Sequence, residues 1–599
     1  MNEARAVLGV NRSFTERSWT ARDLQTLDTH AFARDIGVPE IVARILAGRG
    51  IKPDQAIAYL TPTLKSDLPN PSCLLDMDKA AARLADAILS NEKIAVFGDY
   101  DVDGATSSAL FRRYFNALGR EITIYIPDRI REGYGPNSAA LKMLADAGHK
   151  IIVTVDCGIA AHAPLADAKA LGLDVIVVDH HLSTGVLPPA FAIVNPNRPD
   201  DISGQGMLAA AGVSFLVLVA LNRALRNVQG FERLGVNEPD PRTLLDIVAL
   251  GTIADVVPLT GVNRALVRAG LKVLETAPKP GLDALMSASG MPAGPDRKPG
   301  VYHLGYVLGP RVNAGGRVGR ADLGARLLAG DDPVEAARMA EELNHFNRER
   351  QAVEALVLEE AIAQAALTPD APLVLVTGDG WHPGVIGIVA GRLKERFQKP
   401  AMVIAFEGGF GKGSGRSVPG VNLGRIVQAA AEDGLLLAGG GHAMAAGLSV
   451  QSDKMEALAQ YLQDHVAAAS GQEPAAELLL DGTIGVSGAT GDLWRAMDQA
   501  GPYGAGNPEP MIAIAAARLI KADIVGRNHV RCLLAAPDGT KLGAIAFRAT
   551  ETALGRNLLN NIGRNLHLAG HLRLDLWQGR ERVQLQIEDA ALIEGGTGQ

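Results

Sequence analysis

The sequence predicts an α/β protein with a doubly wound parallel-sheet domain, a long connecting helix, a second, smaller α/β domain and a C-terminal β-barrel. Three observations predict this class. Apolar runs alternate with amphipathic helical patterns across residues 93–194, an Ala- and Glu-rich segment follows Asp332, and short strand patterns with turns follow Glu473. Strands that alternate with helices are typical of a parallel sheet covered on both faces, whereas closely spaced strands are typical of a barrel.

The doubly wound domain is predicted from five short runs rich in Val and Ile. They occupy residues 93–99, 122–127, 151–156, 174–179 and 191–196, and helical patterns lie between them at 105–118, 138–147 and 162–171. We expect this domain to span residues 71–330, after a mostly helical lead-in of residues 1–70. Another helix is expected at residues 242–250, just before the segment GTIADVVPL.

The second half of the chain divides into three expected parts. Residues 332–367 contain no glycine and no proline after Pro333, which predicts one long helix within a connector of residues 331–368. Strand, loop and helix patterns resume after it and predict the second α/β domain at residues 369–470. The short strands of residues 471–599 predict an OB-like barrel.

Charge is distributed unevenly along the chain. The 58 Lys and Arg residues stand against 66 Asp and Glu residues, a net charge of −8, which argues against a protein that coats nucleic acid by bulk positive charge. Residues 510–589 instead hold 11 basic and 7 acidic residues, an excess of four positive charges. An OB-like barrel with a basic face is a plausible platform for a single strand, and a structural barrel with solvated charge is the alternative.

Cysteine content and hydropathy indicate the compartment. Three cysteines without a CxxC pair exclude a disulfide framework and a cysteine-rich zinc site. The longest apolar run, residues 207–221, has 15 residues, fewer than the roughly 20 that span a bilayer, and the first residues do not resemble a secretory signal. We therefore expect a cytoplasmic protein without a membrane segment.

Acidic residues gather where predicted strands end. GDYDVDG at residues 98–104 follows the first strand, and an extended backbone lets Asp99, Asp101 and Asp103 project toward one point. An EF-hand loop is excluded, because position twelve is Leu110 rather than Glu. The next strands end in Asp156 and in the run Asp179, His180 and His181, while Asp255 lies in GTIADVVPL.

These motifs predict one divalent metal site. The carboxyl ends of parallel strands meet at one edge of a sheet, and clustered carboxylates repel one another unless a cation compensates. One Asp at a strand end is more often a helix cap than a ligand, but four acidic motifs and a His-His pair favour ligands. A donor set of carboxylates with one or two imidazoles suits Mn²⁺ or Mg²⁺ better than structural zinc.

Substrate contacts are expected in four further segments. Arg311 and Arg317 flank small residues in GPRVNAGGR, where one of them could anchor a terminal phosphate or form a salt bridge between lobes. Residues 413–417 are expected to form a flexible loop with donors that could track a phosphate backbone. His442 could donate to a phosphate or lie in the core, and Trp381 could stack on a base or pack a lid.

The motifs GDYDVDG, VTVDCG, VVDHH and GTIADVVPL, in this order, resemble the four motifs of the DHH phosphoesterase superfamily. GGGHAMAAG at residues 439–447 resembles the signature of the DHHA1 domain. GPRVNAGGRVGRA, together with the order DHH, long helix, DHHA1 and OB barrel, resembles the branch of single-strand-specific 5′-to-3′ DNA exonucleases. The similarity extends from about residue 50 to residue 590.

The resemblance implies roles for individual residues. Two ions, Mn²⁺ or Mg²⁺, would be held by Asp101, Asp103, Asp156, His180 and Asp255, with Asp156 between them. His181 would face the scissile phosphate, Asp99 would orient the loop, and Asp179 would fix an imidazole. Phe97 replaces a His ligand of the pyrophosphatases, which argues against that activity. The implied substrate-binding residues are Arg311, Asn313, Arg317, Ser414, Arg416, Ser417 and His442.

The resemblance also implies an activity. We expect a metal-dependent exonuclease that removes 5′-mononucleotides from the 5′ end of single-stranded DNA in recombination and repair, associated with the nucleoid. Its expected partners are single-strand-binding protein and a RecQ-type helicase. The alternative within the superfamily is a phosphodiesterase for short RNA or cyclic dinucleotides, whose members typically lack the barrel. A metal-free replisome protein is a further alternative, but every expected ligand position holds Asp or His.

Overall fold

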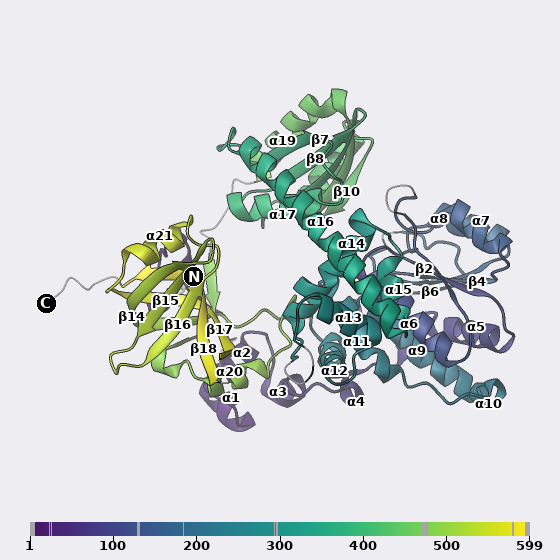
Figure 1. The fold of residues 1–599 in the computed structure, drawn as a ribbon, viewed down its shortest axis with the longest axis horizontal. Helices are drawn as coiled ribbons and strands as arrows, with labels where there is room; N and C mark the ends of the chain where they lie inside the picture. The colour runs from purple at the N-terminus through teal and green to yellow at the C-terminus, as the bar shows by residue number, and fades with distance from the viewer. Residues whose placement is uncertain are drawn as a thin grey trace. The chain divides into compact units, whose positions relative to one another are not determined.

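The computed structural model describes residues 6–593 except 23, 25–26, 129–131, 184, 293, 295–296, 470–476 and 578–579. The chain forms two compact units. The larger comprises Asn70–Asp255 and Gly270–Glu473, and the smaller comprises Met1–Pro69, Val256–Ala269 and Pro474–Gln599. The larger unit contains two sheets joined by a long helix, and the smaller contains a barrel (Figure 1), so the predicted fold class is confirmed.

A five-stranded parallel sheet forms the first half of the larger unit. Its spatial order is β3-β2-β4-β5-β6, and every neighbouring pair is parallel. The strands are β2 (Ile94–Gly98), β3 (Thr123–Tyr125), β4 (Ile151–Val155), β5 (Asp174–Val178) and β6 (Ala192–Val194). β2 and β4 are buried at every residue, as expected for central strands covered on both faces.

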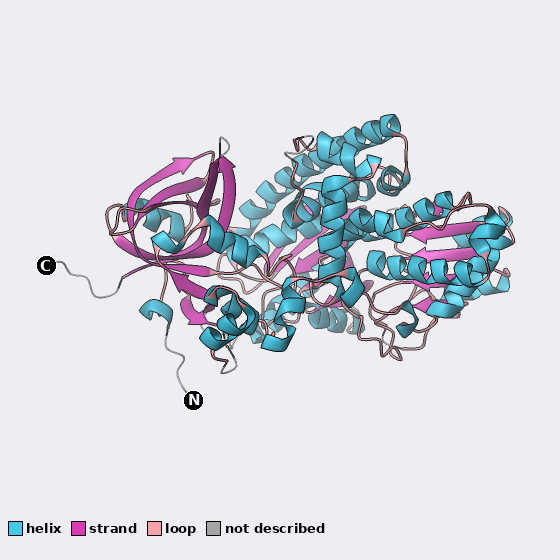
Figure 2. Cartoon of the chain, turned by 90° about the horizontal axis from the view of Figure 1, so that it is seen from below, coloured by secondary structure: helices cyan, strands magenta, loops and turns pink. Residues whose placement is uncertain are grey.

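Helices cover both faces of this sheet (Figure 2). Apolar side chains of α7 (Ser138–Asp146) and α8 (His162–Ala170) share one core with β2, β4 and β5. The other helices of this half are α5 (Met77–Leu89), α6 (Val102–Ala117), α9 (Ala210–Asn227), α10 (Gly230–Leu234), α11 (Leu245–Ala254), α13 (Pro280–Ala288), α14 (Gly309–Val318) and α15 (Leu323–Ala329). α11 includes the GTIA of GTIADVVPL, so it extends beyond the expected end at residue 250 and is capped by Asp255.

The long helix is present as α16 (Pro333–Ala365). Its N-cap is Asp332, whose carboxylate accepts hydrogen bonds from Val334 N and Glu335 N. It leads into a second sheet of order β10-β11-β9-β8-β7, in which only β7 and β8 are parallel. The elements of this domain are β7 (Val374–Asp379), α17 (Ile386–Phe397), β8 (Ala401–Glu407), β9 (Phe410–Arg416), α18 (Leu423–Glu432), β10 (Ala438–His442), β11 (Ala445–Gln451) and α19 (Met455–Ala469).

The glycine-rich segment that was expected to be a flexible loop is mostly a strand, β9, in the middle of this sheet. The reason is the alternation of its glycines. A Cβ atom at Gly413 would lie 2.6 Å from Leu448 Cδ1, and one at Gly415 would lie 2.6 Å from Leu423 Cδ2. Glycine therefore allows close packing on one face, while Lys412, Ser414 and Arg416 share the opposite face.

The C-terminal strands close into a barrel. β14 pairs with β15, β15 with β16, β16 with β18, β18 with β17, and β17 with β14. The pair β16–β18 is parallel, so the barrel is not wholly antiparallel. The elements of this part are β12 (Glu477–Leu480), β13 (Gly482–Ile484), α20 (Gly491–Asp498), β14 (Ile512–Val525), β15 (His529–Ala535), β16 (Lys541–Ala546), α21 (Ala553–Asn560), β17 (Asn565–Trp577) and β18 (Arg580–Leu592).

The N-terminal segment does not stand apart from the barrel. Buried residues such as Ile45 and Leu46 belong to the same hydrophobic cluster as Ile512 and Leu566. Strand β1 (Ser18–Ala21) pairs with β12, and the buried Trp19 donates from Nε1 to Asp589 Oδ2 at 3.0 Å. The helices of the segment are α1 (Thr29–Ile36), α2 (Glu40–Ala47), α3 (Pro53–Leu60) and α4 (Leu64–Asp67), and α12 (Val262–Thr276) follows much later in the chain.

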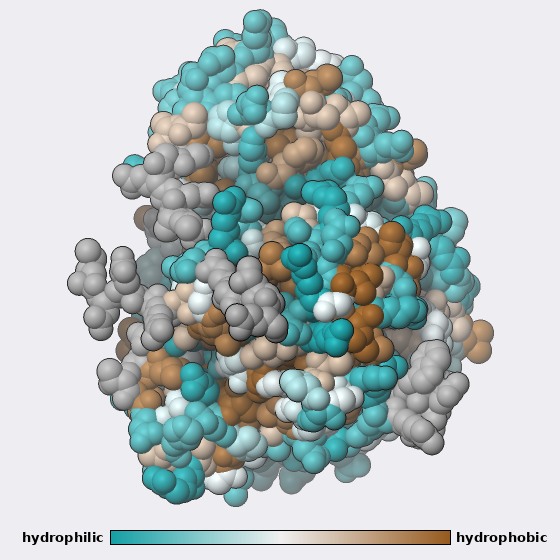
Figure 3. Space-filling model, turned by 90° about the vertical axis from the view of Figure 1, so that its left-hand side faces the viewer, coloured by the Kyte–Doolittle hydropathy of each residue, from teal (hydrophilic) through white to brown (hydrophobic). Residues whose placement is uncertain are grey.

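The surface is mixed in character. In the face shown by Figure 3, hydrophilic residues surround several small hydrophobic patches. Scattered apolar residues of this kind are normal on a folded protein. Within the described residues, no helix is long and apolar enough to span a membrane.

A buried ion pair on α16 gives a test of the packing of α16. Glu354 accepts from Arg350 Nη1 at 2.9 Å and lies 3.5 Å from Arg392 Nε of α17, and the Arg350 and Glu354 side chains are only 10% and 11% exposed. Glu354→Ala would leave a buried guanidinium without its counterion, at a cost of about 3–5 kcal/mol. We expect a clearly lower melting temperature by calorimetry. Glu359→Ala, at an exposed position on the same helix, is the control, and equal melting temperatures for the two variants would contradict this account.

Candidate active site

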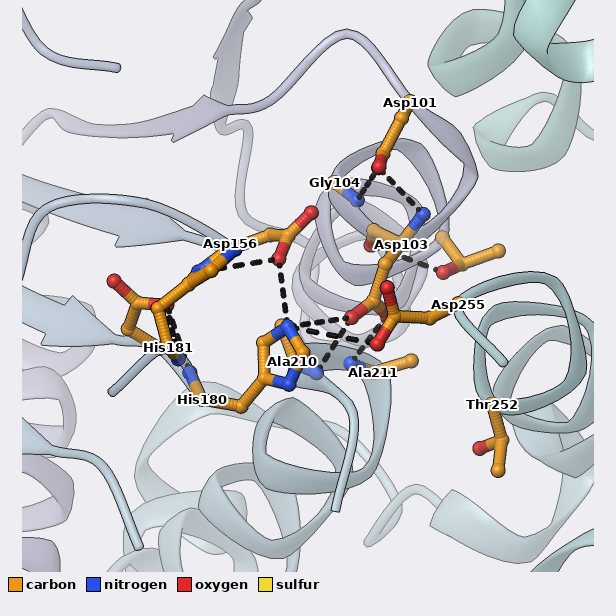
Figure 4. A network of polar contacts seen from close by, with 12 residues as sticks. Asp101, Asp103, Gly104, Asp156, His180, His181, Ala210, Ala211, Thr252 and Asp255 are labelled. Carbon is orange, nitrogen blue, oxygen red and sulfur yellow. Dashed lines mark hydrogen bonds and ion pairs between the residues drawn. The ribbon is translucent and has the colours of Figure 1, made fainter. Parts of the chain in front are cut away.

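Acidic and histidine side chains meet at the carboxyl ends of β2, β4 and β5 (Figure 4). His180 Nε2 lies 3.2 Å from Asp156 Oδ1, 3.5 Å from Asp255 Oδ2 and 3.8 Å from Asp103 Oδ2. Three overlapping groups each bring their ligand atoms within 4.8 Å of one another: Asp99, Asp101 and Asp156; Asp103, His180 and Asp255; and Asp156, His180 and His181. The five residues expected as ligands are thus together, with Asp99 and His181 beside them.

The loop after β2 is held by backbone hydrogen bonds. Asp101 caps α6, accepting from Asp103 N at 2.9 Å and Gly104 N at 3.1 Å through Oδ1. A Cβ atom at residue 104 would lie 2.4 Å from Asp99 O, so only glycine allows the tight turn. Because Oδ1 of Asp101 accepts both capping bonds, Oδ2 is the oxygen that capping leaves for a cation.

Asp103 is positioned by the beginning of helix α9. Its Oδ2 accepts from Ala210 N at 2.6 Å and its Oδ1 accepts from Ala211 N at 2.8 Å. A helix N-terminus favours negative charge, so these bonds partly offset the burial of the carboxylate. A Cβ atom at Gly251 would lie 3.0 Å from Asp103 Oδ1, which makes a small residue necessary there. The apolar sequence at the start of α9 gives no signal of this role.

Asp179 orders the His-His pair. Its Oδ1 accepts from His180 N at 2.7 Å and from His181 Nδ1 at 2.7 Å, and its Oδ2 accepts from Ile159 N at 3.0 Å. Burial opposes ionisation of Asp179, but the bond from His181 and the backbone donors lower its pKa below the usual range. The imidazole that Asp179 fixes is therefore that of His181.

Two asparagines that the sequence analysis missed hold the same segment. Asn195 Nδ2 donates to His181 O at 2.9 Å, and Asn197 Nδ2 donates to His180 O at 2.6 Å. Both follow β6 in the run NPN, and Asn195 is fully buried. Two asparagines directly after a predicted strand were the available signal, because buried amides need hydrogen-bond partners.

Burial and mutual repulsion make it unfavourable for the carboxylates of this cluster to be ionised without a cation. Burial first, and neighbouring carboxylates second, raise the pKa of Asp103 and Asp156 well above the usual range. The same two causes, with Asp101 as the neighbour, raise the pKa of Asp255 to about 7. Bringing several carboxylates so close is favourable only with compensating positive charge.

The cluster fits a divalent cation. Asp156 Oδ1 and His180 Nε2 are buried and have no hydrogen-bond partner among the described residues. Burial, and then the proximity of His181, lower the pKa of His180 to about 4, so its ring is neutral near pH 7 and has a lone pair to offer. A set of carboxylate oxygens with one neutral imidazole is the donor set that Mn²⁺ and Mg²⁺ accept.

A pocket of about 640 Å³ lies between α14 and the second sheet of the larger unit. Its charged and polar lining includes Arg317, His382, Lys412, Ser414 and Arg416. Arg317 Nη1 donates to Gly384 O at 2.8 Å, and Arg416 Nη1 donates to Gly415 O at 2.8 Å. Three of the described lining residues are cationic and none is a carboxylate, which makes this pocket suited to an anion.

The remaining residues expected at the substrate lie outside this lining. Arg311 donates to Asn344 Oδ1 at 3.0 Å and to Val307 O at 2.6 Å, and Asn313 Oδ1 accepts from Val102 N at 3.1 Å. Ser417 is buried and its hydroxyl donates to Val421 O at 2.7 Å, so it closes a turn instead of facing the pocket. His442 is exposed at the end of β10.

Trp381 belongs to a hydrophobic core. It is 7% exposed, it packs within the cluster of α16 and α17, and its Nε1 donates to Glu360 at 2.7 Å. Of the two roles left open for this side chain, the structure therefore supports packing. The neighbouring His382 accepts from Gly384 N at 3.0 Å and lines the anion-compatible pocket.

Family models match three segments of the chain: the N-terminal domain of the DHH family at residues 93–252, the DHHA1 domain at 370–468 and the RecJ OB domain at 480–589. The single-stranded-DNA-specific exonuclease RecJ of Salmonella typhimurium is 35% identical over 92% of this chain and 96% of its own length. The RecJ exonuclease of Escherichia coli shows the same identity and covers the same shares of the two chains. The Bacillus subtilis protein is 34% identical, over 94% of this chain and 69% of its own.

Solved structures agree with this match. The crystal structure of RecJ from Thermus thermophilus in complex with Mn²⁺ has a TM-score of 0.77 at 30% identity and covers 94% of this chain and 77% of its own. The complex with Mg²⁺ gives a TM-score of 0.71 at the same identity, with 94% and 76% covered. The fold and the acidic site define a hydrolase of the DHH family. Within it, the chain belongs to the RecJ family.

The raised carboxylate pKa values predict pH-dependent stabilisation by metal. Between about pH 4 and pH 7, Asp255 binds more protons in the folded, metal-free protein than in the unfolded chain. The free energy of unfolding of the metal-free protein therefore decreases as the pH rises through this range. His180 is already neutral above pH 6. Mn²⁺ requires the ionised site, so the increase in melting temperature on replacing EDTA by Mn²⁺ should grow from pH 6 to pH 7.5.

Asp255→Asn tests the origin of this effect. The variant should show a smaller Mn²⁺-induced increase, with a weaker dependence on pH, because it lacks both the charge and the titrating group. Melting curves at matched free Mn²⁺ measure this. A wild-type increase that is constant or decreasing over that pH range would contradict the account.

Proposed function

We propose that this protein is a metal-dependent exonuclease that hydrolyses single-stranded DNA from its 5′ end and releases 5′-mononucleotides, in recombination and DNA repair. The observation that carries the proposal is the meeting of Asp101, Asp103, Asp156, His180 and Asp255 in one metal-compatible cluster. Relatives named single-stranded-DNA-specific exonucleases share most of the chain, which supports the substrate.

Two divalent ions, Mn²⁺ or Mg²⁺, would occupy this cluster. Asp156 and His180 are each common to two of the three ligand groups, which supports two adjacent positions with Asp156 as the carboxylate shared between them. When bound, such ions neutralise charge on the scissile phosphate and acidify water, so no separate side-chain base is needed.

Neighbouring groups fix the positions of the side chains that form the cluster. Asp103 is fixed by two backbone N–H groups of α9, and Asp101 by two of α6, so these carboxylates lose little freedom on binding. His181 donates from Nδ1 to Asp179, which leaves Nε2 to face the scissile phosphate. Burial opposes protonation of His181, but the bond to Asp179 and the negative charges of Asp179, Asp255 and Asp101 together outweigh it and raise the pKa, which favours a proton that Nε2 can donate to a phosphate oxygen.

The terminal 5′-phosphate would bind in the pocket that Arg317, Ser414 and Arg416 line. Arg416 and Ser414 share one face of β9, so their donors converge, and a guanidinium can bind two phosphate oxygens. Of the two arginines weighed for this role, Arg317 lines the pocket, whereas Arg311 bonds to α16. Asn313 acts indirectly, because its bond to Val102 N links α14 to the Asp101 loop.

The setting of this activity follows from the same substrate. Single-strand-binding protein and a RecQ-type helicase would be partners, since each presents or produces single strands, and the protein would act at the nucleoid. The superfamily alternative, a phosphodiesterase for short RNA or cyclic dinucleotides, does not explain the closed barrel or the match to the RecJ OB domain.

Labelled strands test the activity and its polarity. With Mn²⁺, single strands labelled at the 5′ end should release labelled mononucleotide at once, while 3′-labelled strands shorten progressively. EDTA and the Asp156→Asn variant should each reduce the rate by at least about a thousandfold, because an intact metal site is essential. The exposed Asp146→Asn, on α7, is the matched control. Early release of the 3′ label, or full activity with EDTA, would overturn the proposal.

A second test concerns the terminal phosphate. Arg416→Ala should raise KM for 5′-phosphorylated strands by about 10- to 100-fold, the value of a lost charged hydrogen bond, and should hardly change KM for 5′-hydroxyl strands. Arg425→Ala, at an exposed position of α18, is the control. Equal losses on the two kinds of strand would argue against recognition of the terminal phosphate in this pocket.

A further inference from the structure

The loop between β6 and α9, residues 195–209, is hydrogen-bonded to metal-compatible residues near both of its ends. Near its start, Asn197 Nδ2 donates to His180 O at 2.6 Å. Directly after its end, Ala210 N and Ala211 N donate to the two carboxylate oxygens of Asp103. His180 and Asp103 meet in the cluster, with Nε2 and Oδ2 3.8 Å apart. This β6–α9 loop therefore influences the positions of two expected ligands.

Secondary structure does not fix the β6–α9 loop. The structure describes all of its residues, and none of them is in a helix or a strand. Ile202, in the middle of the loop, is 93% exposed, so apolar packing does not fix that part either. Loops longer than about 12 residues are uncommon in compact domains, and loops move more than the elements they connect. A ligand set needs positions accurate to roughly 0.5 Å, so this loop needs a specific anchor.

Arg198, directly after Asn197, supplies that anchor. Its side chain is only 9% exposed. Nε and Nη2 donate to the two carboxylate oxygens of Asp200 at 2.7 and 2.9 Å, which fixes the guanidinium within the loop. Nη1 donates to Asp76 Oδ2 at 3.1 Å and to Ile193 O at 2.8 Å, which ties the loop to the start of α5 and to β6. A planar guanidinium with bonds in several directions has a fixed orientation.

Asp76 is directed to this contact and not to its own helix. It is the N-cap residue of α5, yet its side chain makes no capping bond. Its Oδ2 instead accepts from Ile193 N at 3.0 Å and from Arg198. The neighbouring Leu75 N donates to Asp201 Oδ2 at 3.0 Å, which is a second bond between the start of α5 and the loop. The carboxylate that would ordinarily cap α5 is thus used to anchor the loop.

Asn197 passes this constraint on to His180. Its backbone N–H donates to Asn195 Oδ1 at 2.7 Å, and its Nδ2 donates to Gly206 O at 3.2 Å as well as to His180 O. A Cβ atom at Gly206 would lie 2.5 Å from Asn197 Oδ1, so the amide is closely surrounded. A shift of Arg198 would therefore move this amide and, with it, the backbone of His180.

We propose that Arg198 is a positioning residue of the metal site, which anchors the β6–α9 loop to α5 so that Asn197 holds His180 Nε2 in place for a metal ion. Arg198 lies outside the lining of the anion-compatible pocket and acts on the site through Asn197. A purely structural ion pair would add stability and leave metal affinity unchanged, so the two roles are separable. The inference rests on the proposed metal-dependent function and deepens it.

The test is a titration of the metal-free protein with Mn²⁺ alone, in which electron paramagnetic resonance measures free Mn²⁺. Arg198→Met removes all of the anchoring bonds and should raise the Kd for Mn²⁺ about tenfold, the usual effect of losing a group that orients a metal ligand. Arg198→Lys keeps the charge without the planar fork and should show a smaller increase. All titrations are made below the melting transition of each variant, so that folded proteins are compared.

Arg83→Met is the matched control. Arg83 lies in the same unit, its side chain is 18% exposed, and it also joins two carboxylates, Glu92 at 2.7 Å and Asp174 at 2.7 Å. Asp174 begins β5, at the opposite end of the strand from the cluster. This variant should lower the melting temperature in EDTA much as Arg198→Met does, and should bind Mn²⁺ as the wild type does. An equal rise in Kd for both variants, or a wild-type Kd for Arg198→Met, would overturn the proposal.

A double-mutant cycle tests the route through Asn197. Asn197→Ala should raise the Kd for Mn²⁺ by a similar factor, and adding Arg198→Met should cause little further increase, because both changes release the same contact. Increases in Kd that multiply in the double variant would mean that the two residues act independently, which would also overturn the proposal.

The DNA reaction separates this proposal from the proposed function. In Arg198→Met, the Mn²⁺ concentration that gives half the maximal rate on single strands should rise by the same factor, while KM for the strand stays unchanged. A raised KM at saturating Mn²⁺ would contradict a role in metal positioning. A wild-type protein that binds Mn²⁺ but does not digest single strands would overturn the exonuclease function, while the Mn²⁺ titrations would still decide the role of Arg198.

Discussion

The arrangement of this protein depends on one electrostatic constraint: several carboxylates are buried within a few ångströms of one another. Asp99, Asp103 and Asp156 are almost inaccessible to water, and Asp255 and Asp101 lie beside them. Such a group is costly in any charge state without positive charge, because burial opposes ionisation and ionised neighbours repel. The surrounding fold supplies backbone donors to some of these groups and leaves ligand atoms of others open, so that a divalent cation completes the structure and the chemistry together.

The scaffold meets this constraint with elements that are themselves rigid. Parallel strands deliver acidic residues to one edge, and the beginnings of α6 and α9 contribute backbone N–H groups and favourable dipoles. Asn313 connects this edge to α14 and thus to the arginine that lines the anion-compatible pocket. The metal-compatible cluster and the anion-compatible pocket are therefore joined through α14 by direct hydrogen bonds, which fixes their spacing better than a flexible loop would.

The sequence was informative where a local pattern determines structure. Strand periodicity and the acidic residue at each strand end were enough to predict the parallel sheet and the cluster at its edge, because parallel strands share one carboxyl edge. The glycine-rich strand β9 was misinterpreted as a loop, since the need for glycine arises from Leu448 and Leu423, which lie elsewhere in the chain. The bond from Val102 N to Asn313 joins residues 211 positions apart, and the sharing of one core by residues 1–69 and the barrel is likewise non-local. No pattern within a short window reports contacts of this kind.

The shared core of the smaller unit has a consequence for synthesis of the chain. Trp19 bonds to Asp589, Phe14 N donates to Ala590 O, and Ile45 and Leu46 pack with strands made last. At about 5–20 residues per second, a ribosome needs roughly half a minute to two minutes between these segments. During that interval the first helices carry apolar faces without their partners, while the larger unit can already fold. Folding of this segment is therefore completed only after the barrel strands have been made, although the segment itself is made much earlier.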